Sequence, residues 1–337
     1  MSSTLERRAV AVGGTLVGEG PAVVIRGRVD LRAYRGQADA YEVLGERATL
    51  VEPYSAADLP AIAERADAVV VGSSWTRDIP LVRSAAGLGL PVVVERRPAA
   101  SLEEWLELAD YCAREGDGRV LLCEGGRLDL GLMRAARAVS GRPVLADVSR
   151  DAALSAAAVA AGADGLVVDS AERGAAPVSG PVGGPVGGGA KLGTYAGART
   201  AGPSRSGTLE FVGPGSLAEA RQELSPATAL RAAEEAVTVV GALVRPEAPG
   251  TLPECREAID RVDAALATLL ERRAALAGIV QRIKPVGGFA GRDLARERAL
   301  VARMALRAPS LGEARLAPIM NAVIEAGLHL AEERSAE

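Results

Sequence analysis

The sequence predicts an α/β TIM-like barrel over residues 1–245, followed by an all-helical domain of three helices over residues 251–337. Three observations predict this division. Short apolar runs rich in β-branched residues recur about every 20 to 28 residues in the first part, the length of a strand and its crossover helix. A Gly/Pro-rich stretch at 172–215 then interrupts the pattern. From Thr251 onward the periodicity is purely helical.

Seven apolar runs are the predicted barrel strands. They are apolar almost without a break, which is typical of parallel strands covered on both faces. Ala/Leu-rich stretches such as Ala56–Ala66 and Ser101–Arg114 follow them and predict helices. A complete barrel of this type has eight strands, so the sequence predicts a truncated one. The runs are Ala22–Ile25, Ala48–Val51, Ala68–Val71, Pro91–Val94, Arg119–Leu122, Pro143–Ala146 and Gly165–Val168.

The segments beside these strands predict a cap and a connection. Ala9–Val17, with Gly13-Gly14 inside it, predicts a hairpin that caps the barrel floor. The stretch at 172–215 has little to bury, and we expect a flexible loop. Ser216–Val244 returns to a helical pattern, and Arg245–Gly250 predicts a linker.

The last part predicts helices at Thr251–Lys284, with Pro253 in the first turn, at Gly291–Arg307, and at about Leu316–Glu333. An apolar stripe along the first helix predicts a wide buried face. Three helices are too few to cover it, so we expect an intertwined homodimer through these helices. The stripe consists of Ile259, Val262, Leu266, Leu269, Leu270, Leu276 and Ile283.

Composition excludes several function classes. The net charge of −4 argues against nucleic-acid and polybasic membrane surfaces, and an aromatic content of 3% argues against base-stacking platforms. The three cysteines have no metal-like spacing, which predicts reduced thiols. No signal peptide or transmembrane span is visible, so we expect a cytoplasmic protein.

Six charged residues of the helical part have spacings that converge around a small dianion. Arg273 and Lys284 are eleven residues apart, which places them about 20° apart on one helix face and about 16 Å apart along the axis. Lys284 is one of two lysines among 39 basic residues. Asp293 and Glu297 share a face beside Arg296.

The sixth residue, Arg256, lies about 25 Å before Arg273 along the same helix. It cannot reach this pocket from its own chain. In an antiparallel helix pair it would enter the pocket of the other subunit, so the constellation requires a symmetric dimer.

Several stretches of the barrel part resemble the metal-dependent 3-deoxy-D-arabino-heptulosonate 7-phosphate (DAHP) synthases, which condense phosphoenolpyruvate with erythrose 4-phosphate on a TIM barrel. The resemblance covers most of residues 9–171, and the helix with Leu224-Ser225-Pro226 is similar to the last segment of that family. The stretches are Ala68–Ser73, Ser101–Glu115 with Leu-Glu-Glu-Trp, Arg119–Gly126 with Leu-Leu-Cys-Glu, Pro143–Ser149 and Ala160–Asp169.

The departures from that family concern its metal and phosphate ligands. Gly27-Arg28-Val29 stands where the family has a metal-binding Gly-Pro-Cys, and Asp147-Val148-Ser149-Arg150 stands where it has Asp-Pro-Ser-His. Glu95 replaces a phosphate-facing lysine and inverts the local field. The resemblance therefore implies a barrel without metal and without DAHP synthase activity. Asp147, Glu124 and Asp169 remain as a residual acidic group, which we expect to be satisfied within the fold or solvated.

The helical part resembles the all-helical chorismate mutases over essentially all of 251–333. The matching residues are Cys255–Asp263, Leu269–Arg273, Lys284 and Arg292–Arg298. Fusion of such a domain to a DAHP synthase barrel is a known arrangement, so the two resemblances support each other.

The chorismate mutase resemblance implies a role for each charged residue and needs no cofactor. Arg256 from the other subunit and Arg273 would hold substrate carboxylates, and Lys284 would bind a carboxylate and the ether oxygen. Arg296 would bind the ring carboxylate, and Asp293 with Glu297 the ring hydroxyl. Two positions depart from the family, because Gly327 and Ala331 replace a pocket Ser and Gln.

These departures leave alternatives open. One is a non-catalytic dimerising protein that regulates a shikimate-pathway partner. Another is a mutase acting on 4-amino-4-deoxychorismate, since Gly327 and Ala331 widen one wall. The main prediction is a chorismate mutase of reduced activity carried on an inactive barrel that serves as scaffold or regulator.

Overall fold

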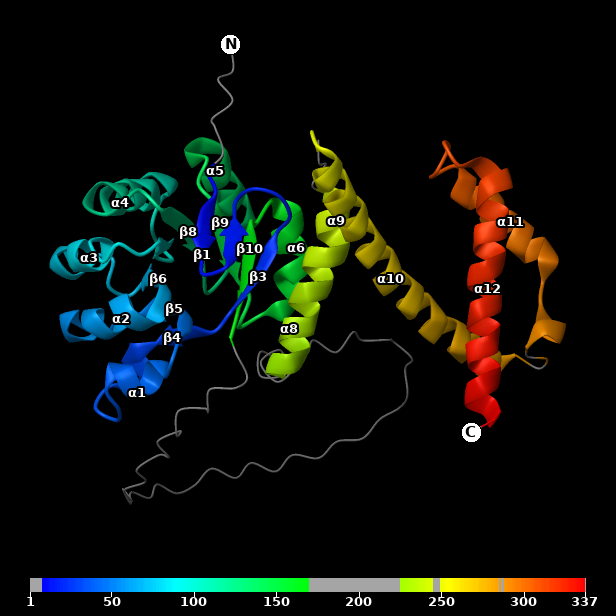
Figure 1. Cartoon of the computed structure of the whole chain (residues 1–337), viewed down its shortest axis with the longest axis horizontal. Helices are drawn as coiled ribbons and strands as arrows, with labels where there is room; N and C mark the ends of the chain where they lie inside the picture. Colours follow the sequence, from blue (N-terminus) through cyan, green and yellow to red (C-terminus); the bar gives the residue numbers. More distant parts are fainter. Residues whose placement is uncertain (1–7, 170–224, 245–248, 285, 287, 337) are drawn as a thin grey trace, which may run out of the picture.

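The computed structural model of this chain describes residues 8–169, 225–244, 249–284, 286 and 288–336. Figure 1 shows a first part in which helices surround a sheet and a last part built from helices alone. Within the described ranges, no helix is both long enough and apolar enough to cross a membrane. The predicted flexible loop at 172–215 lies outside the described residues, as does most of the predicted linker.

The predicted truncated barrel is present (Figure 1). One parallel sheet has the strand order β3-β10-β9-β8-β7-β6-β5-β4. Only Gly27, with a φ of +86°, separates β3 from β4, so these are two halves of one extended segment. Because β3 pairs with β10 and β4 with β5, the sheet closes with seven strand positions. The strands are β3 (Val23–Arg26), β4 (Arg28–Asp30), β5 (Ala48–Glu52), β6 (Ala66–Val71), β7 (Val92–Glu95), β8 (Val120–Glu124), β9 (Val144–Asp147) and β10 (Gly165–Val168).

Strand side chains alternate between the barrel interior and the surrounding helices, because successive residues of a strand point to opposite faces. Val70, Val93 and Leu121 belong to the interior core, whereas Val69 and Val71 pack into the core under the helices. Both faces are therefore apolar, and this explains the unbroken apolar runs in the sequence.

The predicted hairpin is formed by β1 (Val10–Val12) and β2 (Thr15–Val17), which pair antiparallel. Val10, Val12 and Val17 are buried in the same core as the inward-facing strand residues. The Arg8 amide donates to the Gly141 carbonyl (3.0 Å), just before β9 begins. The hairpin therefore closes the end of the barrel at which the strands begin, as predicted.

Short helices cover the outside of the barrel. The predicted helix at Ser216–Val244 is described from Pro226 and contains a π-helical segment, η4 (Ala236–Val240), between two α-helices. The helices are α1 (Ala40–Leu44), α2 (Leu59–Arg65), α3 (Ile79–Ala86), α4 (Leu102–Glu115), α5 (Leu130–Ser140), α6 (Ser155–Ala161), α8 (Pro226–Glu235) and α9 (Gly241–Val244). Single 3₁₀ turns are η1 (Leu31–Tyr34), η2 (Ala56–Asp58) and η3 (Ala152–Leu154).

The helical part consists of α10 (Leu252–Ile283), α11 (Leu294–Ala305) and α12 (Gly312–Ala336), with the 3₁₀ turn η5 (Phe289–Gly291) before α11. Thr251 caps α10 in a capping box with Glu254. Helix α11 begins later than predicted, because the Asp293 side chain caps it through the Arg296 amide. Helix α12 begins at Gly312, before the predicted Leu316.

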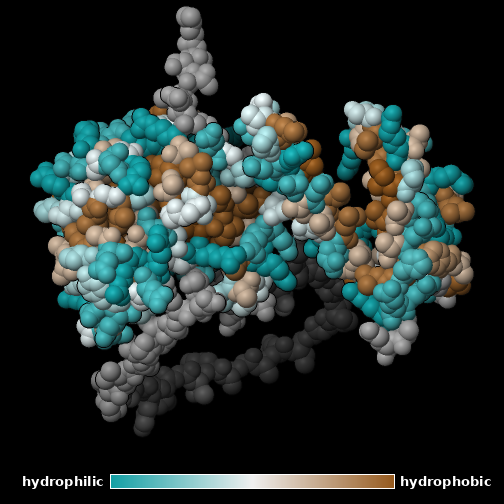
Figure 2. Space-filling view, in the orientation of Figure 1, coloured by the Kyte–Doolittle hydropathy of each residue, from teal (hydrophilic) through white to brown (hydrophobic). Residues whose placement is uncertain are grey.

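The apolar stripe of α10 is not buried within this single chain. Its exposed fractions run from 36% at Leu270 to 76% at Ile283, and Ala265 is the buried residue of this helix. Figure 2 shows apolar side chains at the surface of the helical part. The expectation of a stripe too large for three helices to cover agrees with this exposure, whereas the homodimer itself remains a prediction.

Candidate active site

A pocket of about 330 Å³ lies between α10, the loop before α11, α11 and α12. This volume is within the usual range for small-molecule sites. The pocket brings together five of the six residues predicted from spacing. They are Arg273, Lys284, Asp293, Arg296 and Glu297.

Helix α10 supplies the two cations predicted from its periodicity. It runs without interruption from Leu252 to Ile283, and Lys284 is its C-cap. The half-buried Arg273 donates from Nη1 to the Val323 carbonyl of α12 (3.3 Å). Lys284 Nζ donates to the Gly291 carbonyl (2.8 Å), which ties the loop before α11 to the end of α10. Both cations therefore approach the pocket from one helix face.

The acidic residues of the pocket have partners within the chain. Asp293 Oδ1 accepts the Arg296 amide (2.9 Å) and so caps α11. Glu297 accepts two hydrogen bonds from Arg292, at 2.6 and 3.1 Å. The hydrogen bonds from Arg292 hold the pKa of Glu297 below its usual value. The predicted contact of these carboxylates with a ring hydroxyl stays a prediction.

Arg256 lies outside the pocket. It is exposed in the first turns of α10, about 25 Å along the helix axis from Arg273. The described residues of this chain offer it no ion pair. Its predicted role therefore depends on a second copy of the chain.

The described side chains of α12 that line the pocket are Ile324 and Leu328, and both are apolar. Gly327 is buried, and a Cβ atom there would lie 3.8 Å from Arg273 Nη1. Ala331 is half-buried, and His329 is exposed with its ring 5.0 Å from that of Phe289. The two small residues leave this wall without a hydrogen-bond donor from a side chain.

Two pocket residues with polar side chains had no role in the sequence prediction, Arg292 and Gln281. Arg292 binds Glu297, Glu325 (3.2 Å) and Asn321 (2.7 Å), so it joins α11 to α12. Its position next to Asp293 in the sequence could have indicated that Arg292 lies near the pocket. Its partners on α12 could not be predicted, because they depend on tertiary packing. Gln281 precedes Lys284 by one helical turn, and this spacing places it on the same face.

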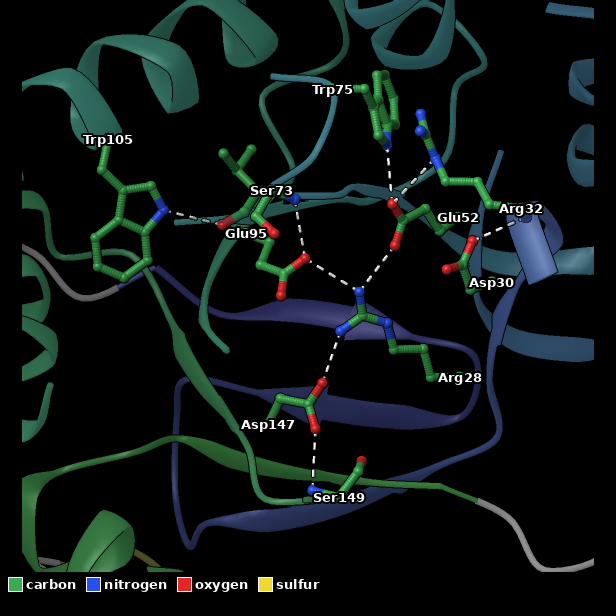
Figure 3. Close-up of polar contacts among 11 residues, drawn as sticks. Arg28, Asp30, Arg32, Glu52, Ser73, Trp75, Glu95, Trp105, Asp147 and Ser149 are labelled. Atoms are coloured by element: carbon green, nitrogen blue, oxygen red, sulfur yellow. Dashed lines mark hydrogen bonds and ion pairs between the residues drawn. The ribbon is translucent and has the colours of Figure 1, made fainter. Parts of the chain in front are cut away.

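A second polar group lies at the opposite barrel end from the hairpin, where the strands end (Figure 3). We call Arg28, Glu52, Glu95 and Asp147 the mouth cluster. Arg28 donates from Nη1 to Asp147 (2.7 Å) and from Nη2 to Glu52 (2.8 Å) and Glu95 (3.1 Å). The carboxylates end β5, β7 and β9, so one guanidinium links strands around the mouth.

Strand alternation explains why these side chains point inward. Glu52, Glu95 and Asp147 each follow an interior residue of their strand by two positions, after Leu50, Val93 and Leu145. Glu124 is one position out of phase, and it binds Arg96 outside the barrel at 2.6 and 2.5 Å.

Further contacts fix the mouth cluster. Glu52 accepts from Trp75 Nε1 (3.0 Å), and Glu95 accepts from the Ser73 amide (3.0 Å). A Cβ atom at Gly72 would lie 1.9 Å from Glu52 Oε1, so only glycine fits there. Burial disfavours the charge of Arg28, but the three carboxylates outweigh it and its pKa is raised.

Burial also raises the pKa of Glu52, although Arg28 opposes this shift. Burial raises the pKa of Glu124 as well, against the effect of Arg96. Of the residual acidic group, Asp147 and Glu124 are therefore satisfied by arginines, and Asp169 is exposed. The expectation for these three residues agrees with their positions.

A larger open cavity of about 550 Å³ lies beside α4 and carries mixed charges. Arg97 and Glu104 on its wall approach each other at 3.5 Å, and the remaining cations alternate with acids. Its lining residues include three arginines and four acidic residues, so the helical pocket is the better candidate for an anionic ligand.

Comparisons with known proteins separate the two parts of the chain. Residues 255–332 match the family model described as chorismate mutase type II. Over 160 residues the chain is 30% identical to a phospho-2-dehydro-3-deoxyheptonate aldolase of Thermotoga maritima, covering 42% of this chain and 46% of that protein.

Two solved structures from Thermotoga maritima are also similar. The crystal structure of its DAHP synthase is 25% identical, with a TM-score of 0.44, over 49% of this chain and 64% of that chain. A truncated form of the same kind of synthase is 25% identical, with a TM-score of 0.41, over 49% of this chain and 80% of that one.

The chain joins a DAHP-synthase-like barrel to a chorismate-mutase-like helical domain. It spans less than half the length of the curated synthase that it matches.

The resemblance to metal-dependent synthases implies a divalent cation at the mouth of the DAHP-synthase-like barrel. The mouth cluster does not fit one, because the N–H groups of Arg28 already bind an oxygen of each carboxylate. A metal ion would have to displace a guanidinium that three carboxylates hold in place. Among the residues that the structure describes, no three His, Cys, Asp or Glu side chains are arranged to hold a metal ion.

Proposed function

We propose that this protein is a chorismate mutase, rearranging chorismate to prephenate in the helical pocket. The observation that carries the proposal is the charge of the pocket. Four cations, Arg273, Lys284, Arg292 and Arg296, face two carboxylates, so the formal charge is +2. Chorismate is a dianion of complementary charge.

The rearrangement is pericyclic and requires no nucleophile, general base or cofactor. The pocket must hold a flexible dianion in a reactive chair, which is an effect of orientation. It must also stabilise the negative charge that grows on the ether oxygen as that bond breaks. Guanidinium groups suit the carboxylates through bidentate hydrogen bonds, and the compact ammonium of Lys284 suits the single ether oxygen.

We further propose that the active protein is a homodimer through the helical domains. The exposed stripe of α10 supports this, because an apolar face of this extent is uncommon on a monomer. In such a dimer Arg256 of each chain would complete the other chain's pocket, adding a third group for the substrate carboxylates.

We propose that the DAHP-synthase-like barrel is catalytically inactive and serves as scaffold or regulator. The mouth cluster supports this proposal, since all three of its carboxylates are bound to Arg28 and its formal charge is negative. Glu95 would repel a phosphate group at the position where the family resemblance places a cation.

The test follows the loss of chorismate absorbance, with the product identified by mass and NMR. Wild-type protein should convert chorismate to prephenate. Lys284→Ala should lower kcat/KM by at least about 100- to 1000-fold, because it removes a donor to the ether oxygen. The matched control is Arg282→Ala, since Arg282 is exposed on the same helix and does not line the pocket.

A wild-type rate equal to that of buffer would contradict the proposal and favour the non-catalytic regulator. The amino analogue is the second candidate, because α12 presents only Ile324 and Leu328 and leaves room beside Gly327. Competition between chorismate and 4-amino-4-deoxychorismate separates these substrates. A higher kcat/KM for the amino compound would assign the pocket to it.

A further inference from the structure

Gln281 is the one uncharged polar side chain among the described residues that line the helical pocket. It is half-buried and lies three residues before Lys284. On an α-helix this spacing separates two side chains by about 60° around the axis and about 4.5 Å along it. Both residues line the pocket, so the amide and the ammonium reach it from neighbouring positions at the end of α10.

The orientation of this amide is fixed by the loop before α11. Gln281 Oε1 accepts the Gly288 backbone N–H (2.9 Å). A backbone N–H can only donate, so it selects the oxygen of the side-chain amide. The NH₂ group is the end of the amide left to donate to a ligand.

The other described side chains of the pocket supply no second uncharged donor for a ligand. Helix α12 supplies Ile324 and Leu328, which cannot donate. Arg292 is occupied by Glu297, Glu325 and Asn321. Arg273 and Arg296 are cations suited to carboxylates.

We propose that the Gln281 NH₂ group donates a hydrogen bond to the ether oxygen of the bound substrate, beside Lys284. This inference rests on the proposed chorismate mutase function. A donor aimed at this oxygen binds the transition state more tightly than the substrate, because negative charge develops there as the bond breaks. Gln281 is then a catalytic residue supplied by α10, in a pocket whose third helix supplies no donor.

Two substitutions test this role against that of a loop anchor. Gln281→Met removes both ends of the amide and should lower kcat about 100- to 1000-fold with little change in KM. Gln281→Glu keeps an oxygen for the Gly288 N–H, but its carboxylate donates only when protonated. Its kcat relative to wild type should therefore be low at pH 8 and rise as the pH falls toward 5.

The outcomes are separable. A wild-type kcat of Gln281→Glu at every pH would overturn the inference. So would a Gln281→Met enzyme within about threefold of wild-type kcat. Circular dichroism of each variant and the exposed neighbour Arg282→Ala serve as controls. A wild-type protein without activity would overturn the proposed function and the inference together, whereas an active wild type with a neutral Gln281→Met overturns the inference alone.

Discussion

The barrel mouth and the helical pocket both gather arginines and carboxylates, but they balance charge in opposite ways. In the mouth cluster one guanidinium faces three carboxylates, and every charged group has a partner within 3.1 Å. In the pocket four cations face two carboxylates, and among the described residues the ion pair there is that of Arg292. The mouth cluster has a formal charge of −2, but each of its carboxylates is bound to Arg28, whereas most cations of the pocket are available to a ligand of opposite sign.

The largest expected effect tests whether Arg256 of one chain completes the pocket that contains Lys284 of the other chain. Arg256→Ala and Lys284→Ala should each be nearly inactive alone. A heterodimer of the two should regain about half of the wild-type activity per dimer, because one of its two pockets combines the intact Lys284 of one chain with the intact Arg256 of the other. The measurement uses two affinity tags, purification through both, and the chorismate assay.

Two results would contradict this prediction. An Arg256→Ala homodimer with wild-type activity would remove Arg256 from the site. An inactive heterodimer would mean that Arg256 and Lys284 act within one chain, which their separation along α10 does not allow.

The next effect concerns the stability that Arg28 gives to the mouth cluster. Arg28→Ala should lower the free energy of unfolding of the barrel by about 3–5 kcal/mol, because three carboxylates lose their shared cation. The barrel Tm should fall by roughly 10 °C, measured by calorimetry. At the same protein concentration and below that Tm, mutase activity should change little.

The matched control is Arg26→Ala. Arg26 lies two residues earlier and pairs with Glu234, but its side chain is 55% exposed, so its loss should cost little. Equal Tm values for Arg28→Ala and wild type would contradict the prediction that Arg28 stabilises the barrel through the three carboxylates. A rise of the wild-type Tm with Mn²⁺ would show that a metal ion, rather than Arg28 alone, belongs there.

The smallest effect concerns the ion pair between Arg292 and Glu297 in the pocket. The pKa of Glu297 in the folded protein should lie below its ordinary value and return toward it in Arg292→Gln, as followed by carboxyl NMR titration. A lowered pKa contributes stability above the unfolded pKa, and this is lost as the pH falls through the folded value. The same Glu297 titration in both proteins would show that the two side chains do not interact in solution.

Most of the barrel was predictable because its strands are continuous apolar runs with regular spacing. The extension of the first strand beyond Gly27 was not predictable, since Arg28 and Asp30 are unusual in a parallel strand. Alternation could have placed Arg28 inside the barrel. It could not reveal which carboxylates of distant strands the guanidinium would meet.

For the helical pocket, periodicity placed Arg273 and Lys284 correctly on one face of α10. Spacing also placed Asp293 and Glu297 on one face beside Arg296, but it did not reveal their partners within the chain. In the structure Asp293 caps α11 and Glu297 binds Arg292. Both partners are close in sequence, but cap geometry and the packing of α11 on α12 decide which contact forms.

The closure of the sheet at Gly27 also sets the width of the barrel. The diameter of a barrel grows with the number of its strands, so seven positions give a narrower ring than eight. In this narrower ring a single arginine side chain reaches acids on three other strands.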